Sequence, residues 1–231
     1  MSSTGELLPS PSLWNNADEG DLRVWLHCVR SSGTKKFIFS PDTDIYQIGL
    51  TVASQQPESE IVVQLSKSLK KGSKFVHLNC LLQALQSDPD LHGIPLPLRP
   101  QALQSLYVCT GCDYISFFVG IGKVSFLTTF YQYASFIAGS NTSQPGSIGE
   151  IGLNVEFDAL LSFYRLVGCT YFRAHASGIE LTSPVALYHS VTGETMLEKH
   201  NKWLAIIRRT IWLRAETETK NMPSTAALKL H

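Results

Sequence analysis

An apolar run that ends in turn-forming and acidic residues constrains the fold of this chain most. Phe37-Ile38-Phe39 is typical of a short buried strand, and Pro41-Asp42-Thr43-Asp44 follows it as a turn. Apolar residues then recur at helical spacing from Ile45 to Val52, with Asp42 or Thr43 able to cap that helix. A similar helical pattern from Leu22 to Arg30 precedes the strand. The order helix, strand, helix predicts an α/β fold.

The next segment predicts a hairpin at the edge of the sheet. Two apolar runs, Ile61 to Leu65 and Phe75 to Leu78, flank a lysine-rich turn around Gly72. Asn79 is expected to cap the helix that follows. A Pro-rich connection then leads to another helix over roughly residues 101–108.

The rest of the chain is expected to be helical. A helix is expected after Gly122, and the polar segment from Gly139 to Gly152 is the best candidate for a domain boundary. Beyond it, the apolar spacing predicts a helix from Phe157 to Val167. A loop over residues 174–193 and a long helix over about residues 195–217 complete the expected order.

Composition limits the setting in which the protein works. The chain has 231 residues, 44% of them hydrophobic, and its formal net charge is zero, so it has no overall attraction for nucleic acid. Because it has no uncharged apolar stretch of 18 residues and no secretion signal, we expect neither a membrane span nor export. The five cysteines fit a reduced intracellular setting. Local lysine clusters, such as Lys67 to Lys74, must supply any attraction for nucleic acid.

Three acidic motifs stand at the ends of predicted elements, and their carboxylates belong to Glu19, Asp21, Asp42, Asp44 and Asp113. Two carboxylates a few ångströms apart repel by about 1 kcal/mol in water and by about 4 kcal/mol where water is partly excluded. A cluster of them therefore favours bound cations and metal-dependent phosphate chemistry. Asp42 and Asp44 also follow a strand, and open α/β sheets bind ligands beyond the carboxyl ends of their strands.

Each acid also has an ordinary explanation. Glu19 and Asp21 fall in the first turn of a helix, where the helix dipole favours acids. Asp42 can cap a helix, and Asp113 can be a turn residue. The hypothesis of a shared metal site therefore depends on the three motifs taken together.

These motifs carry a resemblance to a known family. Glu19-Gly20-Asp21, the strand that ends in Asp42-Thr43-Asp44, and Gly111-Cys112-Asp113-Tyr114 followed by Gly120-Ile121-Gly122-Lys123 are similar in order and spacing to the carboxyl-terminal half of the flap-endonuclease and PIN-like nuclease core. The resemblance covers about residues 19–138. The chain is also similar to uncharacterised animal proteins of suspected transposon origin that carry a reduced version of this core.

The resemblance implies a site that binds two divalent cations, Mg²⁺ or Mn²⁺, and hydrolyses phosphodiesters. Glu19 and Asp21 match the first acidic pair of the family, with Asp21 bridging the metals. Asp42, Asp44 and Asp113 match the set around the second metal. The expected catalytic ligands are Asp21, Asp42, Asp44 and Asp113, with Glu19 as an auxiliary ligand.

The same resemblance implies a nucleic-acid contact. Gly120, Gly122 and Lys123 match a helical turn whose backbone amides face a phosphate, as the positive end of a helix can do. DNA is favoured over RNA as the partner, and the nucleus over the cytoplasm as the location. No membrane partner is expected.

The implied fold is a short, mostly parallel sheet of PIN-like type with flanking helices, followed by a helical extension. The expected parts are a flexible flank over residues 1–18, a partial PIN-like nuclease domain over 19–140 and a helical extension over 141–231. The family core begins with a further strand that bears another metal-binding aspartate, and only 18 residues precede Glu19. We therefore expect either a fragment of a longer protein or an incomplete first metal site.

Two other features suggest different chemistry. Cys109 and Cys112 have the spacing of half a zinc site, but free thiols that are at least half-buried are favoured because no second pair accompanies them. Trp203 and Trp212 flank basic residues and could bind single strands, although a core role is favoured. The alternative to an active nuclease is a catalytically silent PIN-like module that binds nucleic acid or protein.

Overall fold

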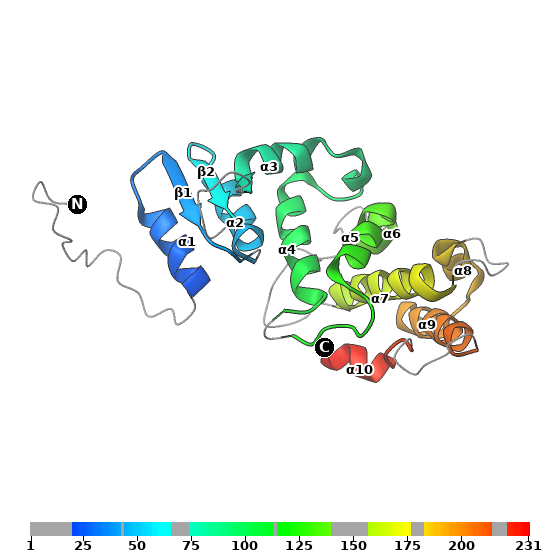
Figure 1. Cartoon of the computed structure of the whole chain (residues 1–231). Coiled ribbons are helices and arrows are strands. Elements are labelled where there is room, and N and C mark those ends of the chain that lie inside the picture. The colour runs from blue at the N-terminus through cyan, green and yellow to red at the C-terminus, as the bar shows by residue number, and fades with distance from the viewer. Residues whose placement is uncertain are drawn as a thin grey trace, which may run out of the picture. The chain divides into compact units, whose positions relative to one another are not determined.

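The computed structural model describes residues 20–42, 44–65, 74–112, 115–139, 157–176, 183–213 and 221–231. The chain divides into two compact units, Met1–Ala84 and Leu85–His231, and the division falls within a helix, α3 (Leu78–Ser87). The first unit holds a small sheet with helices, and the described part of the second is helical (Figure 1). The predicted domain limits at residues 18 and 140 stay predictions.

The first unit follows the predicted order. Its elements are α1 (Gly20–Arg30), β1 (Lys35–Phe39), α2 (Asp44–Ser54), β2 (Glu60–Gln64) and β3 (Phe75–His77). The strand order is β1-β2-β3; β1 pairs with β2 in parallel, with Phe37 opposite Val62, and β2 pairs with β3 antiparallel, with Val63 opposite Val76. The helix-strand-helix order and the edge hairpin are confirmed, and the sheet is small and mixed.

The two faces of the sheet differ in burial. Ile38, Ile61 and Val63 lie on one face and are buried. On that face, Lys36 donates a hydrogen bond from Nζ to the Cys28 carbonyl oxygen of α1 at 2.7 Å, so α1 covers it. Phe37 points to the other face and is 59% exposed. The predicted buried strand Phe37 to Phe39 is therefore wrong except at Ile38, because alternate residues of a strand point to opposite faces.

The described elements of the second unit are α4 (Arg99–Cys109), α5 (Lys123–Gln132), α6 (Ala134–Ala138), α7 (Phe157–Tyr171), α8 (Pro184–Ser190), α9 (Met196–Trp212) and α10 (Thr225–Leu230), with short turns η2 (Pro89–Leu91), η3 (Leu96–Leu98) and η4 (Phe172–Ala176). Helix α7 packs against α5, α6 and α9, as Figure 1 shows. Helices on both sides of the polar segment 139–152 therefore share one core.

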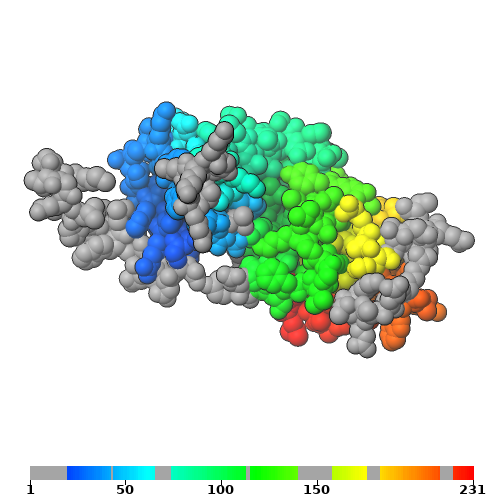
Figure 2. Space-filling model, viewed as in Figure 1, coloured from blue at the N-terminus to red at the C-terminus, as the bar shows by residue number. Residues whose placement is uncertain are grey.

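The end of the chain returns to the start of this unit. His231 Nε2 lies 2.9 Å from the Cys109 carbonyl oxygen at the end of α4. Its ring is also 4.7 Å from that of Phe118, measured between centroids. In Figure 2 the red surface of α10 accordingly adjoins the green surface of this region. This contact joins segments far apart in the sequence and closes the helical unit.

Some helix boundaries differ from those predicted from the sequence. Helix α3 begins at Leu78, so Asn79 lies inside it rather than capping it. Helix α8 occupies part of the predicted loop 174–193, because Ser183 caps it by accepting a hydrogen bond from the Ala186 amide. The end of the predicted long helix, residues 214–217, lies outside the described residues. Among the described residues, no helix is both long and apolar enough to cross a membrane.

Candidate metal centre

Asp42 and Asp44 lie directly beyond the carboxyl end of β1. The Ser40 amide still pairs with the Gln64 carbonyl oxygen at 3.0 Å, and the chain then leaves the sheet. The Asp42 amide donates to Ser40 Oγ at 3.1 Å, and Asp42 Oδ1 accepts from the Asp44 amide at 3.0 Å. Asp42 is exposed and Asp44 is half-buried. These local hydrogen bonds fix the turn between β1 and α2, and the capping of α2 by Asp42 or Thr43 stays a prediction.

Asp21 lies in the first turn of α1 and is half-buried. One turn further along α1, Trp25 is buried and donates from Nε1 to the Ile45 carbonyl oxygen of α2 at 3.0 Å. The Trp25 ring also lies against Gly49, where a Cβ atom would overlap it. Trp25 thus fixes the helix that bears Asp21 to the helix that begins with Asp44.

The described residues include three of the five predicted acids. Asp21, Asp42 and Asp44 belong to the first unit, whereas Glu19 and Asp113 lie outside the described residues. Within the described part of the chain, no three His, Cys, Asp or Glu side chains gather closely enough to hold a metal ion. The convergence of all five acids stays a prediction.

The predicted glycine turn precedes a helix as expected. Gly120 has φ +75°, a conformation that favours glycine, and a Cβ atom there would meet nothing within 4 Å. Gly122 stands at the N-cap of α5 without a side-chain cap. Lys123 Nζ lies 3.2 Å from the centroid of the Tyr107 ring, a cation–π contact. The turn is therefore confirmed as structure, and its binding of phosphate stays a prediction.

Cys109, at the end of α4, is a neutral thiol. Burial raises the pKa of Cys109 to about 11, with a smaller contribution from Cys112. Cys109 and Cys112 are both free and partly exposed. At neutral pH Cys109 therefore stays protonated, and a thiolate is the form that binds zinc.

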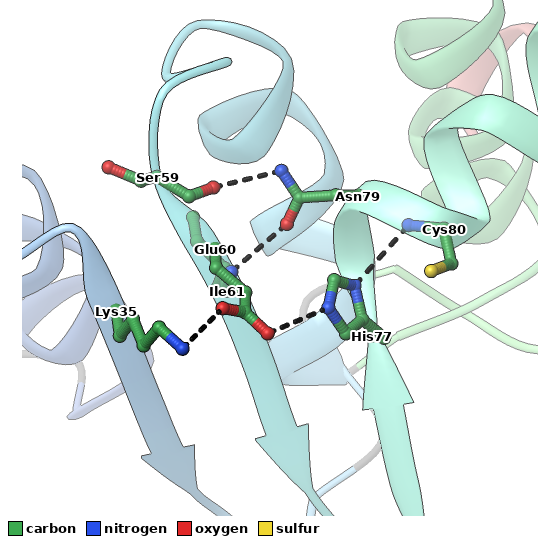
Figure 3. A network of polar contacts seen from close by, with 7 residues as sticks. All are labelled: Lys35, Ser59, Glu60, Ile61, His77, Asn79 and Cys80. Carbon is green, nitrogen blue, oxygen red and sulfur yellow. Dashed lines mark hydrogen bonds and ion pairs between the residues drawn. The ribbon is translucent and has the colours of Figure 1, made fainter.

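A polar network holds the sheet together at the end where β2 begins (Figure 3). Glu60 contacts His77 Nε2 at 3.3 Å and Lys35 Nζ at 3.4 Å, and these contacts, His77 first, hold the pKa of Glu60 below its usual range. Asn79 accepts from the Ile61 amide at 3.0 Å and donates to the Ser59 carbonyl oxygen at 2.8 Å. Asn79 therefore ties the start of α3 to β2, which explains its place inside the helix.

We expect Asn79→Ala to lower the free energy of unfolding by about 1–3 kcal/mol, because the Ile61 amide loses its partner at a buried residue. Asn79→Asp keeps the acceptor for that amide but replaces the donor to the Ser59 carbonyl oxygen with a second acceptor, so it should also destabilise the fold. Urea unfolding measures both changes, and Cys80→Ala, at the exposed neighbouring residue, is the control. Equal urea midpoints for Asn79→Ala and Cys80→Ala would show that the two hydrogen bonds contribute little.

An aromatic group lies on the open face of the sheet and was not predicted from the sequence. Phe37, Phe39 and Phe75 are 59%, 51% and 53% exposed. The two-residue spacing of Phe37 and Phe39 was a usable signal, because residues i and i+2 of a strand share a face. Trp203, a candidate for single-strand binding, is instead fully buried, and Trp212 is 73% exposed. The favoured core role is thus confirmed for Trp203 and wrong for Trp212.

Comparison with known proteins adds no family assignment: no family model, curated protein or solved structure matches the chain.

Proposed function

We propose that this protein is a divalent-metal-dependent nuclease of PIN-like type that hydrolyses phosphodiester bonds in nucleic acid, DNA more than RNA. One observation carries the proposal: Asp42 and Asp44 lie just beyond the carboxyl end of β1, a strand in parallel pairing, at the start of the connecting helix α2. Ligand sites of open α/β sheets occur at this position. The order of the acidic motifs in the sequence supports the same proposal.

The ligand set of the proposal is Asp21, Asp42, Asp44 and Asp113, with Glu19 as an auxiliary ligand. Carboxylate oxygens are the donors that Mg²⁺ and Mn²⁺ prefer, and the exposed Asp42 side chain is already oriented by the Asp44 amide. Carboxylates of this kind are the donors that a hard cation would require. Such a cation supplies a Lewis acid that lowers the pKa of water and neutralises charge on the phosphate.

The start of α5 is proposed to hold the nucleic-acid backbone. The first amides of a helix have no partner within the helix and carry its positive end, which favours a phosphate. Gly122 leaves this helix end uncovered by any side-chain cap, and Gly120 shapes the preceding turn. The proposed role of Lys123 is to add positive charge beside this helix end.

Metal binding can be tested by thermal unfolding with and without Mn²⁺. We expect Mn²⁺ to raise the melting temperature of the wild type, because a ligand that binds only the folded state stabilises it. Asp42→Asn and Asp113→Asn each remove a proposed metal ligand, so Mn²⁺ should not raise their melting temperatures. Asp88→Asn is a matched control, since Asp88 Oδ1 accepts from the Asp90 amide at 2.9 Å in the same type of local turn. An unchanged wild-type melting temperature would contradict the metal site and favour the silent module.

A further inference from the structure

The open face of the sheet, defined by Phe37, Phe39, Val62, Gln64 and Phe75, carries a compact aromatic surface. The strand register places these five residues on one side, with Phe37 opposite Val62, Phe39 opposite Gln64, and Gln64 opposite Phe75. The rings of Phe37 and Phe75 approach to 6.0 Å between centroids. Phenylalanines from both outer strands therefore lie together across the middle strand.

The three phenylalanines form the accessible part of this surface, whereas Val62 is half-buried and Gln64 is buried. The three phenylalanines are each more than half exposed, whereas the opposite face of the sheet is buried against helices. Contiguous exposed apolar side chains on a folded protein usually mark a binding surface. Aromatic rings, unlike aliphatic side chains, also offer flat faces on which nucleic-acid bases stack.

The charges around the surface favour an anionic partner. Lys74 is exposed and directly precedes Phe75 in the chain. Glu60, at the far end of the same face, already pairs with Lys35 and His77. Cationic side chains beside exposed aromatic rings are the combination by which proteins bind single-stranded nucleic acid.

We propose that the open face of the sheet binds single-stranded nucleic acid, with bases stacked on Phe37, Phe39 and Phe75 and the backbone attracted by the exposed Lys74. Asp42 follows Phe39 by three residues, so its backbone lies within about 11 Å of the surface. A strand bound here would reach the proposed metal site. The inference rests on the proposed function only in this last point, because binding does not require metal.

Fluorescence anisotropy with a labelled twelve-residue oligothymidylate in EDTA tests binding without cleavage. We expect Phe37→Ala and Phe75→Ala each to weaken binding about tenfold, as the loss of one stacking contact does. Leu96→Ala is the control, since Leu96 is an apolar residue of the second unit with a similar exposure, 51%. Wild-type affinity in both phenylalanine variants, or no binding by the wild type, would overturn the proposal.

Two further substitutions separate stacking from apolar docking. Phe37→Trp should keep the affinity and show quenched tryptophan fluorescence on binding, whereas Phe37→Leu should bind about as weakly as Phe37→Ala. Light scattering of the same proteins tests a second copy of this chain as the occupant. A wild-type dimer that Phe75→Ala dissociates, without oligonucleotide binding, would assign the surface to self-association and overturn the proposal. Binding in EDTA without any Mn²⁺-dependent cleavage would contradict the nuclease proposal alone.

Discussion

Trp203→Ala is expected to lower the free energy of unfolding by about 3–5 kcal/mol, the usual loss for a large buried aromatic side chain. Trp203 is fully buried in α9, and its Nε1 donates to the Pro184 carbonyl oxygen at 3.0 Å. Its ring packs edge-to-face on Tyr188 and Phe136, at 5.6 Å and 5.9 Å between centroids. The ring also lies over Gly168 of α7, where a Cβ atom would overlap it. Urea unfolding measures the loss.

Trp212→Ala is the matched control for that experiment, because Trp212 belongs to the same helix and is 73% exposed. It should change stability by less than about 0.5 kcal/mol. If Trp203→Ala fails to fold, Trp203→Phe keeps most of the ring packing and should remain measurable. Similar stability of the Trp203 and Trp212 alanine variants would contradict the packing of α8 and α9 described above.

The stability of the second unit is expected to fall as the pH drops from about 6.5 to about 4, because of His200. His200 is fully buried, and burial lowers its pKa from 6.5 to about 4. Arg165 Nη1 lies 3.1 Å from His200 Nε2, and the Met196 carbonyl oxygen lies 2.7 Å from His200 Nδ1. These partners match a neutral ring that accepts at Nε2 and donates at Nδ1.

The direction of this pH dependence follows from which state binds the proton. Between the two pKa values the unfolded chain binds a proton at His200 and the folded chain does not, so lowering the pH favours unfolding. The two pKa values correspond to a loss of about 3 kcal/mol, complete near pH 4. His200→Gln should remove this part of the pH dependence, with the exposed His189→Gln as control. Parallel stability curves for His200→Gln and wild type between pH 4 and 6.5 would contradict the buried neutral ring.

The sequence predicted those elements that local chemistry determines. Pro41 and Asp42 act within their own turn, so the end of β1 and the start of α2 could be placed without tertiary information. The exposure of Phe37 could not be predicted, because a short apolar run does not show which face of a sheet is covered by helices. A local rule predicted Asn79 as a cap, but its partners are Ile61 of β2 and Ser59 just before that strand, about 20 residues earlier in the chain.

In the candidate site, too, local features could be predicted from the sequence and long-range contacts could not. Asp21, Asp42 and Asp44, the described acids, lie at the ends of helices or strands as predicted. Turns and helix starts favour aspartate locally, so their positions could be predicted from the sequence. Whether Asp113 joins them depends on how distant parts of the chain pack, which no spacing in the sequence determines. The aromatic surface needed the register of three strands before Phe75 could be grouped with Phe37.

Cleavage of flap and hairpin DNA in Mn²⁺ tests the nuclease proposal most directly. We expect Mn²⁺-dependent product with the wild type and with the control Asp88→Asn. Asp42→Asn and Asp113→Asn should slow cleavage by about a hundredfold or more, because each removes a group that stabilises charge at the reacting phosphate. Absence of Mn²⁺-dependent cleavage by the wild type, or cleavage unaffected by both substitutions, would contradict the central claim.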